Sequence, residues 1–224
     1  MARPIRGAGS GRRHAFYANL DSGSDLFRIG GLADALFAIV LTLVVLEFRL
    51  PESSYTSNTD LLAGLVTLAP VLYAYAMTFA VGRLHWIAHH RLVSLLTSYD
   101  RGLLMWNLAF MGAVSGLPFS SAVVGRNGDL ALTWSLYAAN MVAIGQVLTL
   151  MLDHAIRHDL LRPEVRGRLA AFLRLRALSA PLVFLLSIPV ALIDTTAAEL
   201  TPLLLFGYNA VLNARFRDPS GRRY

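Results

Sequence analysis

The chain has 224 residues, of which 55% are hydrophobic and 15% are charged, and its mean hydropathy is +0.53. This composition is too apolar for a soluble domain of this size and predicts an integral membrane protein. The chain has no cysteine, which excludes disulfides and cysteine-type zinc sites, and all 20 basic residues are arginine, giving a net charge of +6.

The two ends of the chain are predicted to be tails outside the membrane domain. Residues 1–24 contain scattered Arg, Gly and Ser without an apolar run of signal-peptide length, so we predict a disordered cytoplasmic tail and no cleavable signal. Residues 215–224 are predicted to form a cytoplasmic C-terminal tail. Residues 25–214 then form one transmembrane domain.

Six apolar windows of about the length that spans a bilayer occupy this domain. The sequence therefore predicts an all-α, six-helix membrane bundle, with spans at about 28–49, 61–83, 102–124, 130–152, 175–194 and 198–214. The last window is short and contains Pro202 in its first turn, where proline is tolerated.

The arginines divide unevenly between the two sides of such a bundle. Only Arg49 and Arg126 fall on the side opposite the termini, and the other eighteen fall on the termini's side. By the positive-inside rule, both termini should be cytoplasmic. Clustered arginine can also bind nucleic acid, but between apolar spans it is usually a topology signal, so we expect no nucleic-acid partner.

The first span contains an acid. Asp34 lies one to two turns inside the cytoplasmic end, and a charge at the bilayer centre costs at least ~2.5–3.5 kcal/mol on insertion scales. Arg28 lies too far round the helix for an ideal same-helix pair. Trp86 and His89, in the run HWIAHH, and Asn107 of the third span offer hydrogen-bonding groups. We predict an ionised Asp34 held by hydrogen bonds or an arginine, in a structural network of these residues.

One face of the first span is a candidate pore lining. Ile39, Thr42 or Leu43, and Leu46 follow the spacing of a single helix face. An apolar ring can narrow and gate a channel, and a threonine hydroxyl one turn away can contact a dehydrating cation. The alternative from periodicity is ordinary packing against other helices.

The sequence contains little that indicates metal binding or catalysis. His85 and His89 have the i, i+4 spacing of zinc ligands, but no third ligand is evident, so we expect no metal and no cofactor. The chain has neither a GxSxG elbow nor a Walker-type phosphate loop. We therefore predict that it is not an enzyme.

The run from Arg28 to Asp34 resembles the RxxxFSD motif of the endosomal/lysosomal potassium channel family, known as transmembrane protein 175, and in particular its bacterial branch. The two charged positions match, while Leu32 and Ala33 stand where the motif has Phe and Ser. The similarity extends through FAIVLTLVVLEFRLP, GRLHWIAHHRL and DRGLLMWNLAFMGAVSGLPFSSAVVG, roughly residues 25–125.

The resemblance implies a six-helix subunit that assembles as a homotetramer, with the first helices lining a cation pore without a TVGYG filter. It assigns the constriction to Ile39 and a selectivity role to Thr42, on the face that periodicity already singles out. The sequence therefore predicts a passive, potassium-permeable channel in the bacterial plasma membrane, with Ile39, Leu43 and Leu46 narrowing the pore, Thr42 beside them, and its own copies and lipids as partners. A proton-coupled secondary transporter and a non-conducting membrane scaffold are the alternatives.

Overall fold

The computed structural model describes residues 22–51, 55–165 and 167–216. Helices make up nearly all of this part of the chain. They are α2 (Ser22–Leu43), continued by the 3-10 turn η1 (Val44–Glu47), then α3 (Asn58–Val66), α4 (Ala69–Ser94), α5 (Arg101–Ser115), α6 (Leu117–Asn127), α7 (Ala131–Arg157), α8 (Arg168–Ala191), α9 (Thr195–Leu200) and α10 (Leu203–Arg215). The predicted all-α class is confirmed. The expected tails fall largely outside the described residues, except that α2 already begins at Ser22.

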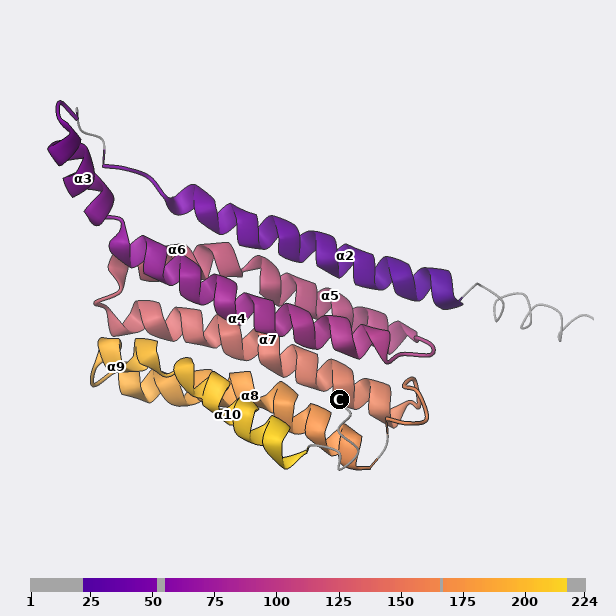
Figure 1. The fold of residues 1–224 in the computed structure, drawn as a ribbon. Helices are drawn as coiled ribbons and strands as arrows, with labels where there is room; N and C mark the ends of the chain where they lie inside the picture. The colour runs from indigo at the N-terminus through magenta and orange to yellow at the C-terminus, as the bar shows by residue number, and fades with distance from the viewer. Residues whose placement is uncertain (1–21, 52–54, 166, 217–224) are drawn as a thin grey trace, which may run out of the picture.

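The long helices lie side by side in one bundle (Figure 1). Helix α2 forms one edge and packs against α4 and α5, α7 runs through the middle, and α8 and α10 form the opposite edge. Helix α3 projects from one end. Helix α2 therefore has one side against its own chain and one side facing away from it.

Four helical segments in the described part of the chain are long and apolar enough to cross a membrane. They are Arg28–Glu47, Arg101–Asn127, Ala131–Arg157 and Arg168–Ala191, and a fifth is counted if α3 and α4, bent by 48° at their junction, form one span. The chain is thus a multi-pass membrane protein. The sixth predicted span, 198–214, is divided between α9 and α10, and α10 has only 13 residues.

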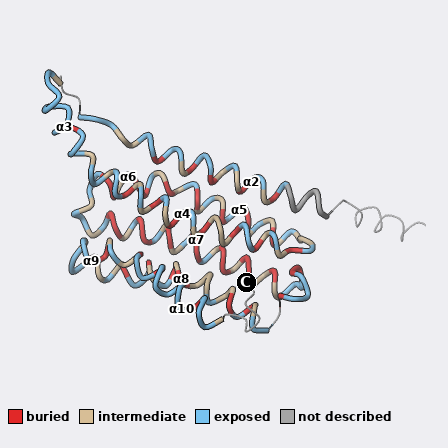
Figure 2. Tube along the Cα trace, in the orientation of Figure 1, coloured by how far each residue is buried: buried red, intermediate tan, exposed pale blue. Residues whose placement is uncertain are grey.

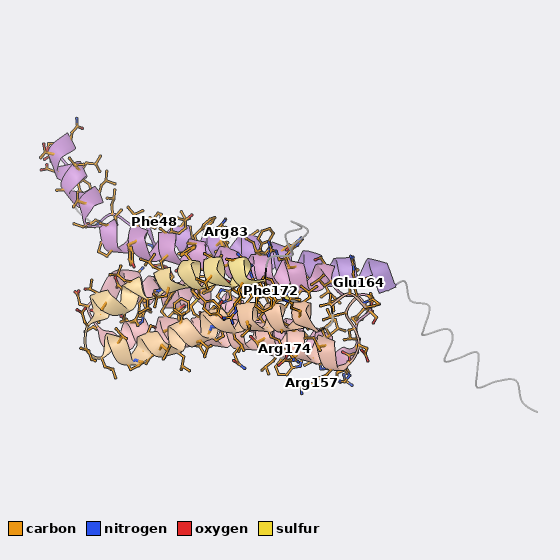
Figure 3. The ribbon with its side chains drawn as sticks, turned by 60° about the horizontal axis from the view of Figure 1, so that its bottom comes forward. Phe48, Arg83, Arg157, Glu164, Phe172 and Arg174 are labelled. Carbon is orange, nitrogen blue, oxygen red and sulfur yellow. The ribbon has the colours of Figure 1, made fainter. Side chains whose placement is uncertain are left out.

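The second predicted span, 61–83, ends too early in the sequence. A hydropathy window ends at the first charge, here Arg83, but α4 continues to Ser94 because His85, His89 and Leu92 are buried beyond it. Pro70 lies in the first turn of α4, where the missing N–H of proline is tolerated. The same missing N–H prevents α3 from continuing through Pro70 as one unbroken helix. Arg83 therefore lies within α4 and not beyond its end, between the two ends of the bundle in Figure 3.

The core is built around α7. Trp134 and Tyr137 are buried against Phe184 of α8, with ring centroids 6.4 and 6.0 Å away. The indole N–H of Trp134 donates to the Ser187 hydroxyl at 2.9 Å. Thr78 on α4 bonds the Tyr137 hydroxyl at 3.2 Å. These aromatic residues are thus buried with their polar atoms satisfied, as a membrane interior requires.

Close contact between α7 and α8 depends on Gly145. A Cβ at this position would lie 2.5 Å from Cδ of Pro181, whose ring is stiff. We expect Gly145→Ala to destabilise the fold by about 1–3 kcal/mol, because the two helices must separate. The measurement is the apparent melting temperature in detergent. Gly112→Ala is the matched control, since its Cβ would meet nothing within 4 Å, and an unchanged stability of Gly145→Ala would contradict this packing.

Candidate functional site

Helix α2 has two distinct faces. Along α2 and its continuation η1, buried positions recur every three or four residues, at Ile29, Ala33, Phe37, Val40 and Val44. This spacing places them on one side, against α4 and α5. Figure 2 shows buried and exposed positions alternating along the helix.

The opposite side of α2 and of its continuation η1, which together we term the outer face of α2, contains Ile39, Thr42 and Leu43 of α2 and Leu46 of η1. Ile39 is 55% exposed, Leu43 42% and Leu46 62%. All four predicted constriction and selectivity residues therefore lie where no other described helix of the chain covers them. An exposed apolar stripe of this kind faces either lipid or another copy of the chain.

Thr42 supplies a hydroxyl on this face. Its Oγ lies 2.9 Å from the carbonyl oxygen of Ala38 and 2.8 Å from that of Ile39. The single hydroxyl hydrogen is thus donated to the helix itself, and the lone pairs of the oxygen remain for another partner. The outer face combines an apolar surface with one oxygen able to coordinate a cation.

Asp34 meets α4 on the other side of α2. The indole N–H of Trp86 donates to Oδ1 of Asp34 at 2.8 Å, and both side chains are partly buried. This hydrogen bond satisfies the partly buried indole N–H of Trp86. It fastens α2 to α4 from a position that does not face outward with Ile39 and Leu46.

A second hydrogen bond joins α4 to α5. Nε2 of His89 lies 2.8 Å from Oδ1 of Asn107, and since that oxygen only accepts, Nε2 carries the hydrogen. The His89 ring stacks on Phe110 at 4.7 Å, and Phe110 lies 5.9 Å from Phe37 of α2. The predicted network residues thus form two separate hydrogen-bonded pairs, Asp34 with Trp86 and His89 with Asn107. Arg28 lies at an exposed position of α2.

The i, i+4 pair His85 and His89 does not form a common site. Nδ1 of His85 lies 3.1 Å from the carbonyl of Val81, whereas His89 turns to Asn107 on α5. His85 also borders a small cavity of about 40 Å³ lined by Arg176 and Asn209 of the other edge of the bundle. The two imidazoles therefore make separate contacts, His85 with the backbone of its own helix and His89 with α5.

Sequence reasoning missed two contacts between distant residues. Glu47, at the far end of α2, pairs with Arg126 of α6. At the near end, Asp100 meets His154 and His158, which are some fifty residues away in the sequence. No local signal marks either pairing, because each depends on how the helices assemble.

Comparisons with known proteins agree with this architecture. The sequence model of the family described as "Endosomal/lysosomal potassium channel TMEM175" matches residues 28–118, which include both faces of α2 and the Asp34, Trp86, His89 and Asn107 contacts. A crystal structure of a lysosomal potassium-selective channel TMEM175 homolog from Chamaesiphon minutus superposes with a TM-score of 0.72 at 24% identity, covering 85% of this chain and 99% of that one. This structural similarity shows that the two proteins share a fold.

Two relatives named as potassium channels are similar to this chain over most of their own length. A protein of Streptomyces collinus named a potassium channel is 27% identical over 192 residues, covering 82% of this chain and 92% of the relative. A protein of Chamaesiphon minutus, also named a potassium channel, is 30% identical over 148 residues, covering 65% of this chain and 73% of the relative. At that identity and coverage, the chain belongs to the TMEM175 family.

Proposed function

We propose that the chain is a potassium-permeable cation channel that conducts passively. Four copies surround one axis, with the outer face of α2 lining the path. Ile39 narrows this path together with Leu43 and Leu46, and Thr42 lies next to the constriction. The permeant ion is K⁺, and no cofactor takes part.

The outer face of α2 is the observation that carries the proposal. A single copy cannot enclose a pore, but a closed symmetric assembly brings identical faces around an axis. An apolar ring there excludes water until an ion enters, and an adjacent hydroxyl oxygen partly replaces the lost hydration. The relatives named potassium channels support the same assignment.

The same proposal includes a six-span topology with both termini in the cytoplasm of a bacterial cell. It requires α3 and α4 to act as one bent span and α9 with α10 to form the last. The arginine distribution supports this orientation, since charged residues such as Arg157, Glu164 and Arg174 gather towards one end of the bundle, away from Phe48 (Figure 3).

A proton-coupled exchanger would need a carboxylate that alternates between the two sides. Asp34 instead bonds Trp86 on the covered side of α2. This contact suits a packing role better than repeated protonation and release. The channel is therefore the stronger proposal.

Measurement of K⁺ flux into liposomes tests the channel proposal. Purified protein should pass K⁺ down its gradient without ATP and without a proton gradient, at a rate that does not saturate like a carrier. Protein in detergent should have the mass of four copies. Saturable transport that depends on a proton gradient would favour an exchanger, and a stable monomer without flux would overturn the pore.

A further inference from the structure

Three potential metal ligands meet where α5 begins and α7 ends, at the end of the bundle that also holds the start of α2 (Figure 1). Nε2 of His154 lies 2.9 Å from both carboxylate oxygens of Asp100. Nδ1 of His158 lies 3.6 Å from Oδ2 of the same residue. One ligand atom from each residue falls within 4.8 Å of the other two.

These separations suit a tetrahedral transition-metal ion. With bonds of about 2.0–2.2 Å to nitrogen and oxygen, neighbouring ligand atoms of zinc lie about 3.3 Å apart. The distances of 2.9 and 3.6 Å from Oδ2 of Asp100 to His154 and His158 lie on either side of that value. Small side-chain adjustments would therefore convert the observed contacts into a coordination sphere.

The backbone presents the three side chains in advance. Asp100 is the N-cap of α5, where Oδ1 accepts from the Leu103 N–H at 2.7 Å and leaves Oδ2 turned towards His158. His154 and His158 are one turn apart at the end of α7, and their rings stack at 4.1 Å. Gly102 makes room for the His154 ring, because a Cβ there would overlap it. The site therefore needs no rearrangement of the helices.

The loops around the site are also fixed. The N–H of Thr97 donates to the carbonyl of Leu160 at 2.8 Å, and the N–H of Arg162 donates to that of Leu95 at 2.9 Å. These bonds join the α4–α5 connection to the α7–α8 connection on either side of the Leu96–Leu161 bridge. They hold Asp100 at a set distance from the two histidines.

The cluster can be reached from outside the bundle. His158 is 54% exposed, which leaves an approach from solvent.

We propose that Asp100, His154 and His158 bind one transition-metal ion of the Zn²⁺ class, with the fourth position open to water. Two imidazoles and one carboxylate are a ligand set that zinc and its neighbours accept and that magnesium does not favour. The ion would clamp the start of α5 to the end of α7. The site is separate from the proposed pore and does not depend on it.

Titration calorimetry of the full-length chain in detergent with ZnCl₂ tests the proposal. We expect one ion per chain, and an apparent melting temperature several degrees higher with Zn²⁺ than with chelator, because a ligand that binds the folded state stabilises it. His154→Gln and His158→Gln should each weaken binding by at least about 100-fold, more than the loss of an outer-shell contact.

Two further variants keep the test decisive. Asp100→Asn retains a good N-cap residue and so preserves the fold while removing the anionic ligand. His90→Gln removes an exposed histidine of α4 that lies outside the cluster, and its Zn²⁺ binding should equal that of the parent. Absence of saturable binding in the parent, or binding retained in both His154→Gln and His158→Gln, would overturn the site whatever the outcome of the flux assay.

Discussion

Replacing Ile39 by Asn should raise K⁺ flux by roughly tenfold and bring the preference for K⁺ over Na⁺ close to unity. In the proposed tetramer, four apolar Ile39 side chains at the narrowest point would make an ion shed water with no compensating contact, and four amides would supply that contact. Removal of about 1.4 kcal/mol from the barrier corresponds to a tenfold change in rate. The amides would coordinate K⁺ and Na⁺ alike, so the preference for K⁺ over Na⁺ would fall along with the barrier to ion passage.

Bi-ionic single-channel recording measures both quantities. Leu186→Asn is the matched control, because Leu186 is similarly exposed but lies on α8, at the edge of the bundle opposite α2. It introduces the same polar group into an apolar surface and should leave conductance and selectivity unchanged. If Ile39→Asn assembles normally and conducts as the parent does, Ile39 does not line the pore.

The two faces of α2 follow from its sequence. Apolar residues occur all round this helix, but Ile39, Thr42 and Leu46 share one side, and the structure leaves that side uncovered. That these residues line a pore stays a prediction, because the axis of an oligomer is not contained in one chain.

The partner of Asp34 could also be predicted in outline. A carboxylate in an apolar helix must find a donor, and the HWIAHH run of α4 supplies an indole N–H in a neighbouring span. The end of α4 could not be predicted from hydropathy, because its last turns bury His89 against Asn107 of α5, a partner that only the folded bundle provides. The contact of Asp100 with His154 has the same origin, as it depends on α5 and α7 lying antiparallel.

The second large effect concerns Asp34. We expect Asp34→Ala to lower stability by about 1–3 kcal/mol, because the Trp86 indole N–H loses its acceptor while remaining partly buried. Asp34→Asn keeps a carbonyl oxygen in the same place and should lose less stability, and its remaining loss relative to the parent measures the value of the negative charge. Both variants should also reduce flux, since α2 is attached to α4 through this contact and any shift of the helix moves Ile39.

A double-mutant cycle with Trp86→Phe isolates the contact. Trp86→Phe removes the donor but keeps an aromatic ring, so the coupling free energy between the two positions reports the hydrogen bond itself, and we expect about 1–2 kcal/mol in detergent unfolding. Asp129→Asn, at an exposed position between α6 and α7, is the control and should change stability by less than about 0.5 kcal/mol. If the effects of the Asp34 and Trp86 changes are additive, Trp86 does not hold the carboxylate. If the Asp34→Asn variant is as stable and active as the parent, the carboxylate is not needed as an anion. Coupling with loss of flux would instead identify Asp34 as the residue that sets the position of the pore helix without itself meeting the ion.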